Sequence, residues 1–297
     1  MNRPDLLAIN KQIESFPALP AIVTKVMAVT ANPESSANDL MEVVLPDQAM
    51  CSAILKVANS AFFGVPREVS TMERAVVVLG FEEIRNIIIG KAIFASFPRM
   101  DKENRQRVNL LWEHALTCGL AAKIIAESLN LSPSELFIAG LIHDIGKLAM
   151  IMTYPHDYSI LGDLSNPGNY RTTTEEEENA FAINHEKVSL QLANRWLLPE
   201  KLVMAMGYHH TPHDAPCHKH YPLIVQLADI LSLVYLSQAT STPWNMTSFF
   251  NDFLPETGSL WRSNKLHWDP TKPAIWLEDL KQSCQANQHI LDIFTSP

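Results

Sequence analysis

The chain has 297 residues, of which 47% are hydrophobic and 19% are charged, and its formal net charge is −9. A composition this apolar can form a sizeable buried core, which excludes an extended disordered protein. The 32 acidic residues outnumber the 23 basic ones, which argues against nonspecific binding to nucleic acid or to an anionic membrane, because both depend on clustered Lys and Arg.

Helical patterns recur along the chain, and no convincing alternating strand pattern is found, so we expect an all-α fold. In the first part, apolar side chains fall at helical spacing from Cys51 to Phe63. Ser70 and Glu73 form a capping-box pattern before another helix, which Gly80 should break. We expect an N-terminal helical subdomain over residues 1–100.

A second helical series follows a polar junction at residues 98–108 and begins with a helix from about Asn109 to Ser128. Later helices should begin at capping residues or prolines. These residues are Ser132, Asn184, Pro199 and Pro222. We expect a metal-binding helical subdomain over residues 101–240, followed by a C-terminal extension over residues 241–297 that ends in a helix.

Two groups of acidic residues in this half are interpreted as parts of helix starts. Glu135 lies three residues after Ser132 and should complete a capping box at that helix start. The run Glu175–Glu178 is interpreted as the solvated first turn of a helix, because negative charge is favourable near a helix N-terminus.

The sequence also bears on location. The N-terminus has no apolar stretch long enough for a signal peptide, and the apolar window at residues 87–97 is too short to span a bilayer. Four cysteines lie far apart without a Cys-x-x-Cys pair, which fits a reducing compartment. We therefore expect a cytoplasmic protein without membrane insertion.

Polar side chains in otherwise apolar helices indicate a metal site in the second half. Imidazoles and carboxylates are ligands of first-row transition metals. Leaving such groups buried without partners costs about 1–3 kcal/mol each. The candidate ligands are His114, His143, Asp144, His185, His209, His210 and Asp229.

Each candidate also has a simpler interpretation. A single histidine on an apolar face is usually a hydrogen-bonded core residue, and Asp229 alone could be a buried acceptor. His213, His218 and His220 lie in a polar loop with prolines and are interpreted as exposed to solvent. The ordered set on successive helices is what favours a metal site.

The order of His114, His143-Asp144 and Asp229 resembles the HD superfamily of metal-dependent phosphohydrolases, which is named after that dipeptide. Other segments resemble its HDOD (HD-related output domain) branch, and the resemblance covers about residues 14–235. These segments are Phe16-Pro17-Ala18-Leu19-Pro20, the stretch from Lys56 to Gly64, the stretch from Ala75 to Gly80, and His185-Glu186-Lys187-Val188.

The resemblance implies an N-terminal helical bundle packed on an HD-type helical core, in a bacterial signalling protein. Many members have lost the metal ligands, whereas this chain keeps them and has counterparts of extra histidines in the related HD-GYP phosphodiesterases. By that likeness Asp144 would bridge two ions. One ion would be held by His114, His143 and Asp229, and the other by His185, His209 and His210.

The implied cofactor is one or two transition-metal ions, with iron or manganese favoured and nickel or zinc as alternatives. The candidate catalytic residues are Asp144, which would bridge the ions, and Lys147. By the likeness, Lys147 matches a lysine that contacts substrate phosphate in HD-GYP enzymes. Its simpler interpretation is a surface lysine near a helix end. Two departures argue against catalysis. Thr211–Pro216 replaces the Gly-Tyr-Pro signature, and Leu110 stands where some of these enzymes have a further carboxylate.

Two functions stay open from the sequence. The first is a regulatory protein with a structural metal site, acting on unidentified signalling proteins. The second is an active metal-dependent phosphohydrolase or phosphodiesterase whose ligand is a nucleotide, a cyclic dinucleotide or another phosphoester. A scaffold without metal is disfavoured, because it leaves the aligned polar residues unexplained.

Overall fold

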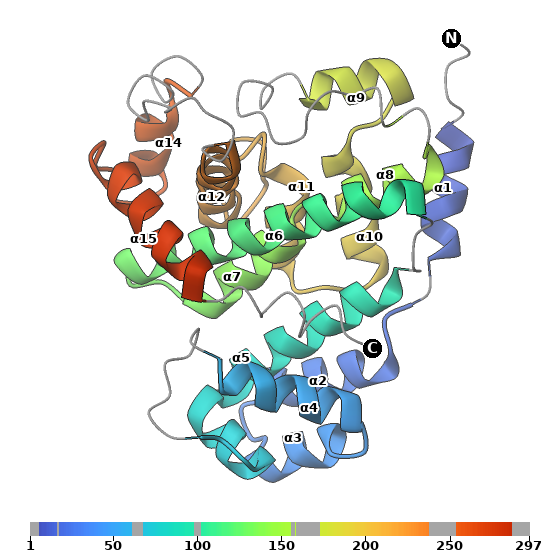
Figure 1. Cartoon of the computed structure of the whole chain (residues 1–297), viewed down its shortest axis with the longest axis vertical. Coiled ribbons are helices and arrows are strands. Elements are labelled where there is room, and N and C mark those ends of the chain that lie inside the picture. The colour runs from blue at the N-terminus through green and yellow to red at the C-terminus, as the bar shows by residue number, and fades with distance from the viewer. Residues whose placement is uncertain are drawn as a thin grey trace. The chain divides into compact units, whose positions relative to one another are not determined.

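The computed structural model of the chain contains helices and no strand in the residues that it describes, which confirms the expected all-α class (Figure 1). The described residues are 6–16, 18–60, 68–97, 102–155, 158, 173–237 and 254–286. The chain divides into two compact units, each of which is treated by itself. The larger unit consists of residues 1–16 and 99–281, and the smaller one of residues 17–98 and 282–297.

In the smaller unit, the last of four helices packs against the other three. The core between them buries Val26, Leu40 and Ile54 completely. The helices are α2 (Ala21–Ala31), α3 (Ala37–Val44), α4 (Gln48–Ala58) and α5 (Met72–Ser96).

Helix boundaries in the smaller unit follow local signals, with two corrections. Gly80 interrupts α5 with φ 80° and ψ 173°, which is backbone geometry nearly restricted to glycine, so the expected break is confirmed. The cap expected at Ser70 is wrong by one residue, because the Thr71 hydroxyl accepts the hydrogen bond from the Arg74 N–H at 3.3 Å. The helix expected up to Phe63 ends at Ala58, and residues 61–67 lie outside the described residues.

The larger unit is organised around the long helix α6, which packs along α7 and α12, while α10 packs on α8 and α11 (Figure 1). The helices are α1 (Leu6–Ser15), α6 (Lys102–Ser128), α7 (Pro133–Ile142), α8 (Ile145–Thr153), α9 (Thr173–Phe181), α10 (His185–Arg195), α11 (Glu200–Tyr208), α12 (His220–Ser237), α14 (Thr257–Ser263) and α15 (Lys272–Ala286). The starts expected near Asn184 and Pro199 are confirmed.

The first helix belongs to this larger unit. α1 packs against α8 and α10, and the Arg195 guanidinium donates hydrogen bonds to the carbonyl oxygens of Glu14 at 2.8 Å and Phe16 at 3.1 Å. Within residues 1–100, the structure therefore separates α1 from the four helices of the smaller unit.

Three other expectations about the larger unit are corrected. α6 begins at Lys102, inside the expected polar junction, and α12 begins at His220 rather than at Pro222. Ser132 precedes α7 but makes no side-chain capping bond. Glu135 instead accepts hydrogen bonds from the Lys201 ammonium at 3.0 Å and from the Tyr221 hydroxyl. A tertiary ion pair has replaced the local cap.

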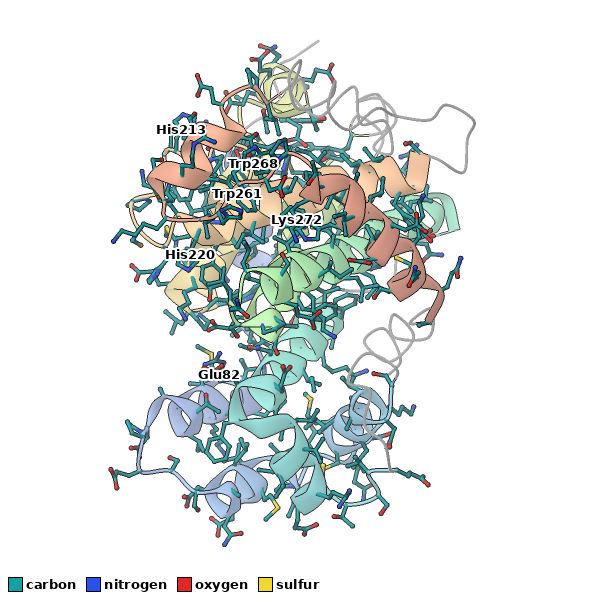
Figure 2. All side chains as sticks on the ribbon, turned by 90° about the vertical axis from the view of Figure 1, so that its left-hand side faces the viewer. Glu82, His213, His220, Trp261, Trp268 and Lys272 are labelled. Atoms are coloured by element: carbon teal, nitrogen blue, oxygen red, sulfur yellow. The ribbon has the colours of Figure 1, made fainter. Side chains whose placement is uncertain are left out.

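Two apolar stretches, residues 133–153 and 220–237, are long enough to cross a membrane, but most of each is buried inside the protein. Core helices that are covered on every side have this composition. In the described C-terminal part, the ring of Trp261 in α14 lies against that of Trp268, in the segment before α15, with the ring centres 5.3 Å apart (Figure 2). The indole N–H of Trp276 donates to the Ser128 hydroxyl at the end of α6.

Candidate metal centre

Seven polar side chains converge inside the larger unit, and all but His210 are buried. They come from α6, from the two-residue junction between α7 and α8, from the first residue of α10, from the end of α11 and from α12. Because α7 and α12 are buried on nearly every side, a polar residue in or beside them has to find its partners inside the protein.

Asp144 lies at the middle of this cluster. Its Oδ2 atom is 3.4 Å from Nε2 of His114 and 3.3 Å from Nε2 of His143. Its Oδ1 atom is 3.4 Å from Nε2 of His185 and 3.5 Å from Nε2 of His209. Each carboxylate oxygen therefore faces its own pair of imidazoles.

The donor atoms form two separate groups joined by a third, which consists of His143, Asp144 and His209, and within each group they lie within 4.8 Å of one another. In one group, Oδ1 of Asp229 approaches Nε2 of His114 to 3.1 Å. The two separate groups are His114, His143 and Asp229, and His185, His209 and His210. The structure thus brings the seven candidate side chains into one cluster.

Hydrogen bonds at the far side of the rings hold three histidines with Nε2 toward the cluster. Nδ1 of His143 lies 2.7 Å from the carbonyl oxygen of Gly140. Nδ1 of His114 lies 3.0 Å from the hydroxyl of Ser232, and that hydroxyl donates its own proton to the Asp229 carbonyl. The hydroxyl therefore accepts from His114. Outer contacts of this kind orient metal ligands in proteins.

Glu177 of α9 orients the third histidine, and the sequence interpretation missed it. Its carboxylate accepts hydrogen bonds from Nδ1 of His185 at 2.6 Å, from the His185 backbone N–H at 2.8 Å and from the Tyr158 hydroxyl at 2.6 Å. The interpretation of residues 175–178 as solvated is wrong for this fully buried position. The sequence pattern that could have indicated burial is the i, i+4 spacing of Glu177 from Phe181, which places both side chains on one helix face.

Burial and neighbouring charges shift the pKa values of the cluster's members in opposite directions. Burial raises the pKa of Asp144, but His143 and Lys147 outweigh it and hold that pKa well below its usual range. Burial lowers the pKa of His114, whereas Asp144 and Asp229 raise it, with a net value of about 9. Burial also lowers the pKa of Lys147, and Asp144, whose Oδ2 is 2.6 Å from the ammonium, raises it above its ordinary value.

Several buried atoms of the cluster make no hydrogen bond within the segments that the structure describes. They are Nε2 of His114, Nε2 of His143, Oδ1 of Asp144 and both carboxylate oxygens of Asp229. Such atoms are rare in folded proteins, because each costs the desolvation of a polar group. Nitrogen and oxygen donors that face one another in this way fit a first-row transition-metal ion.

Some residues of the loop after the histidine pair are exposed to solvent and others are half-buried. Asp214 is 61% exposed and pairs with His213 at 3.4 Å, so it lies outside the buried cluster. His218 and His220 are only half-exposed, which corrects their interpretation as fully solvated. Leu110 is 54% exposed, so the position on α6 one turn before His114 is open to solvent.

Comparisons with known proteins agree with this architecture. The family described as HDOD domain matches residues 16–212. A protein of Treponema pallidum (strain Nichols), described as uncharacterized, is 24% identical over 249 residues, which are 82% of this chain and 47% of that protein. The chain therefore spans about half the length of this curated relative.

Two solved structures share the fold. An HDOD domain protein with unknown function from Geobacter sulfurreducens has a TM-score of 0.69 at 22% identity, covering 96% of this chain and 97% of that one. A protein from Shewanella amazonensis SB2B, provisionally described as a phosphohydrolase, has a TM-score of 0.70 at 18% identity, covering 97% of this chain and 98% of that one. At these identities the likeness establishes the helical fold.

Proposed function

Since the chain belongs to the HDOD domain family, we propose that it is a signalling protein whose larger unit holds one or two transition-metal ions. The observation that carries this proposal is the convergence of buried imidazoles and carboxylates on the two oxygens of Asp144. When bound, such ions supply positive charge and Lewis acidity. The residues that would hold them are His114, His143, Asp144, His185, His209, His210 and Asp229.

Two features support a regulatory role: the ligands come from several segments of the larger unit, and the loop after the histidine pair lacks the catalytic signature. They come from α6, the α7–α8 junction, α10, α11 and α12, so ligation would link five segments of the larger unit. The loop at residues 211–216 lacks the Gly-Tyr-Pro signature, and its aspartate is exposed. Metal binding that depends on the folded arrangement of these segments would stabilise the unit.

Elemental analysis tests this proposal. After purification without chelators, or after reconstitution with iron or manganese, we expect one or two ions per chain. Free metal at 1,000 times the dissociation constant adds about 4 kcal/mol of stability. Chelation should therefore lower the melting temperature by roughly 8–16 °C for a unit of this size. Protein that retains no metal after reconstitution, with a melting temperature indifferent to chelator, would exclude the proposal.

A second candidate function, hydrolysis of a phosphoester, is favoured by one observation. Lys147 is buried, and its ammonium lies against Asp144, where a positive group could bind a nonbridging phosphate oxygen. Catalysis also requires that the phosphodiester be held in line within about 3–3.5 Å of the attacking group. The altered loop after His210 should position a cyclic dinucleotide poorly.

We therefore expect the fully metallated protein to turn over cyclic di-GMP more slowly than about 1 per second, the lower end of typical enzyme rates. The measurement is hydrolysis of cyclic di-GMP beside an aryl phosphodiester, with protein of known metal content. Faster turnover that is abolished by Asp144→Ala would contradict the prediction and make the protein an enzyme. Hydrolysis of the aryl substrate alone would identify a smaller phosphoester as the substrate class.

A further inference from the structure

A separate group of metal-ligating side chains lies where α11 begins and where the loop at residues 209–219 leads into α12. Nε2 of His218 is 3.2 Å from Oε2 of Glu200, and the Cys217 thiol lies close to the same carboxylate. The sulfur, imidazole nitrogen and carboxylate oxygen all lie within 4.8 Å of one another. None of these three residues belongs to the buried centre.

The backbone brings these side chains together. His218 has φ 47°, a left-handed conformation in which histidine occurs more often than most other residues with a side chain. The Lys219 ammonium donates to the His213 carbonyl at 2.7 Å, which closes the loop on itself. The His218 and Glu200 side chains are 34% and 66% exposed, and an ion pair this exposed contributes little to stability.

We propose that Glu200, Cys217 and His218 bind a zinc-like divalent cation, with water in the fourth position. Thiolate, imidazole and carboxylate are all zinc ligands, and three protein ligands with one water complete a tetrahedral site. One thiolate and one carboxylate balance the charge of a divalent ion. The sulfur separates this site chemically from the buried centre, whose candidate ligands offer only nitrogen and oxygen.

This site would act as a clip on the segment from Glu200 to His218. That segment carries His209 and His210, two proposed ligands of the buried centre, and the loop that stands in place of the Gly-Tyr-Pro signature. An ion at the clip would fix both ends of the segment. The clip does not require the buried centre to be metallated, so it goes beyond the proposed function.

Titration with Co²⁺ tests the proposal, because Co²⁺ takes tetrahedral zinc sites and gives a near-ultraviolet charge-transfer band when a thiolate coordinates it. In protein whose buried centre has first been loaded with iron or manganese, we expect the band to saturate at one added Co²⁺ per chain and to be bleached by Zn²⁺. It should disappear in Cys217→Ser and persist in Cys51→Ser, a matched change at another half-buried cysteine. The His218→Ala and Glu200→Gln variants should each weaken Co²⁺ binding at least roughly tenfold.

Three results would overturn the proposal. One is the absence of the band in the wild-type protein at saturating Co²⁺. Another is a band that survives Cys217→Ser, which would place the thiolate elsewhere, for example at the buried Cys118. The third is a wild-type Co²⁺ affinity in both His218→Ala and Glu200→Gln. Because all three side chains are partly exposed, these variants should fold, which circular dichroism checks. A band that Cys217→Ser abolishes reports only on the clip, so absence of that band is distinguishable from failure of the buried centre to bind metal.

Discussion

The variant Asp144→Ala is expected to lose metal from both positions of the buried centre, because each oxygen of this carboxylate faces a different pair of imidazoles. Removing a ligand of only one position should leave the other position partly filled. The variant should also be less stable without metal. Lys147 would lose the partner that its ammonium contacts at 2.6 Å, and breaking a buried ion pair from one side costs about 3–5 kcal/mol.

Two measurements check this prediction. Metal content after identical loading tests the loss of metal, and the free energy of unfolding in chelator tests the loss of stability. The matched control is Asp214→Ala, which removes an exposed aspartate paired with His213 at the surface. Its stability should stay within about 0.5 kcal/mol of the wild type, as is usual for surface changes. An Asp144→Ala protein that keeps two ions, or that unfolds like the control, would show that this carboxylate does not organise the centre.

The variant Gly146→Ala is expected to destabilise the larger unit by about 3 kcal/mol, the upper end of the usual cost of overpacking a core. A Cβ atom at this position would lie 2.1 Å from the carbonyl oxygen of His185 and 2.7 Å from the hydroxyl of Ser189. A backbone carbonyl cannot rotate away, so α8 and α10 would have to separate. That movement would draw His185 away from Asp144, so metal affinity should fall as well.

Gly207→Ala in α11 provides a matched control. The atoms nearest to the new Cβ would be Cδ1, Cβ and Cγ of Leu190, at 2.8, 3.1 and 3.3 Å; the outer carbons of a leucine can turn aside, and the contact with its Cβ needs a shift of only a few tenths of an ångström. Alanine also has a helix propensity about 1 kcal/mol better than glycine, which offsets the crowding. The net change should stay within about 1 kcal/mol. Denaturant midpoints of the two variants decide the matter, and equal midpoints would refute the close α8–α10 contact as the cause.

Features that depend on neighbours in the sequence were determined by the sequence itself. The all-α class follows from helical periodicity without strand alternation, and Gly80 breaks α5 because its conformation excludes a side chain. Asn184 caps α10 by accepting from the Lys187 N–H, as its residue type predicts. In each case the groups that interact lie within a few residues of one another, so the local pattern contains the information.

Other features were decided only by the tertiary structure. Ser132 and Glu135 have the spacing of a capping box, but Glu135 binds Lys201 and Tyr221 instead. Glu177 looks like one member of a solvated acidic run until α9 places it against His185. The ligand types and their order along the chain could be identified, with the family resemblance, from the sequence. Which oxygen of Asp144 faces which imidazole, and where Cys217 meets Glu200, depends on packing between segments far apart in the chain, which local periodicity does not specify.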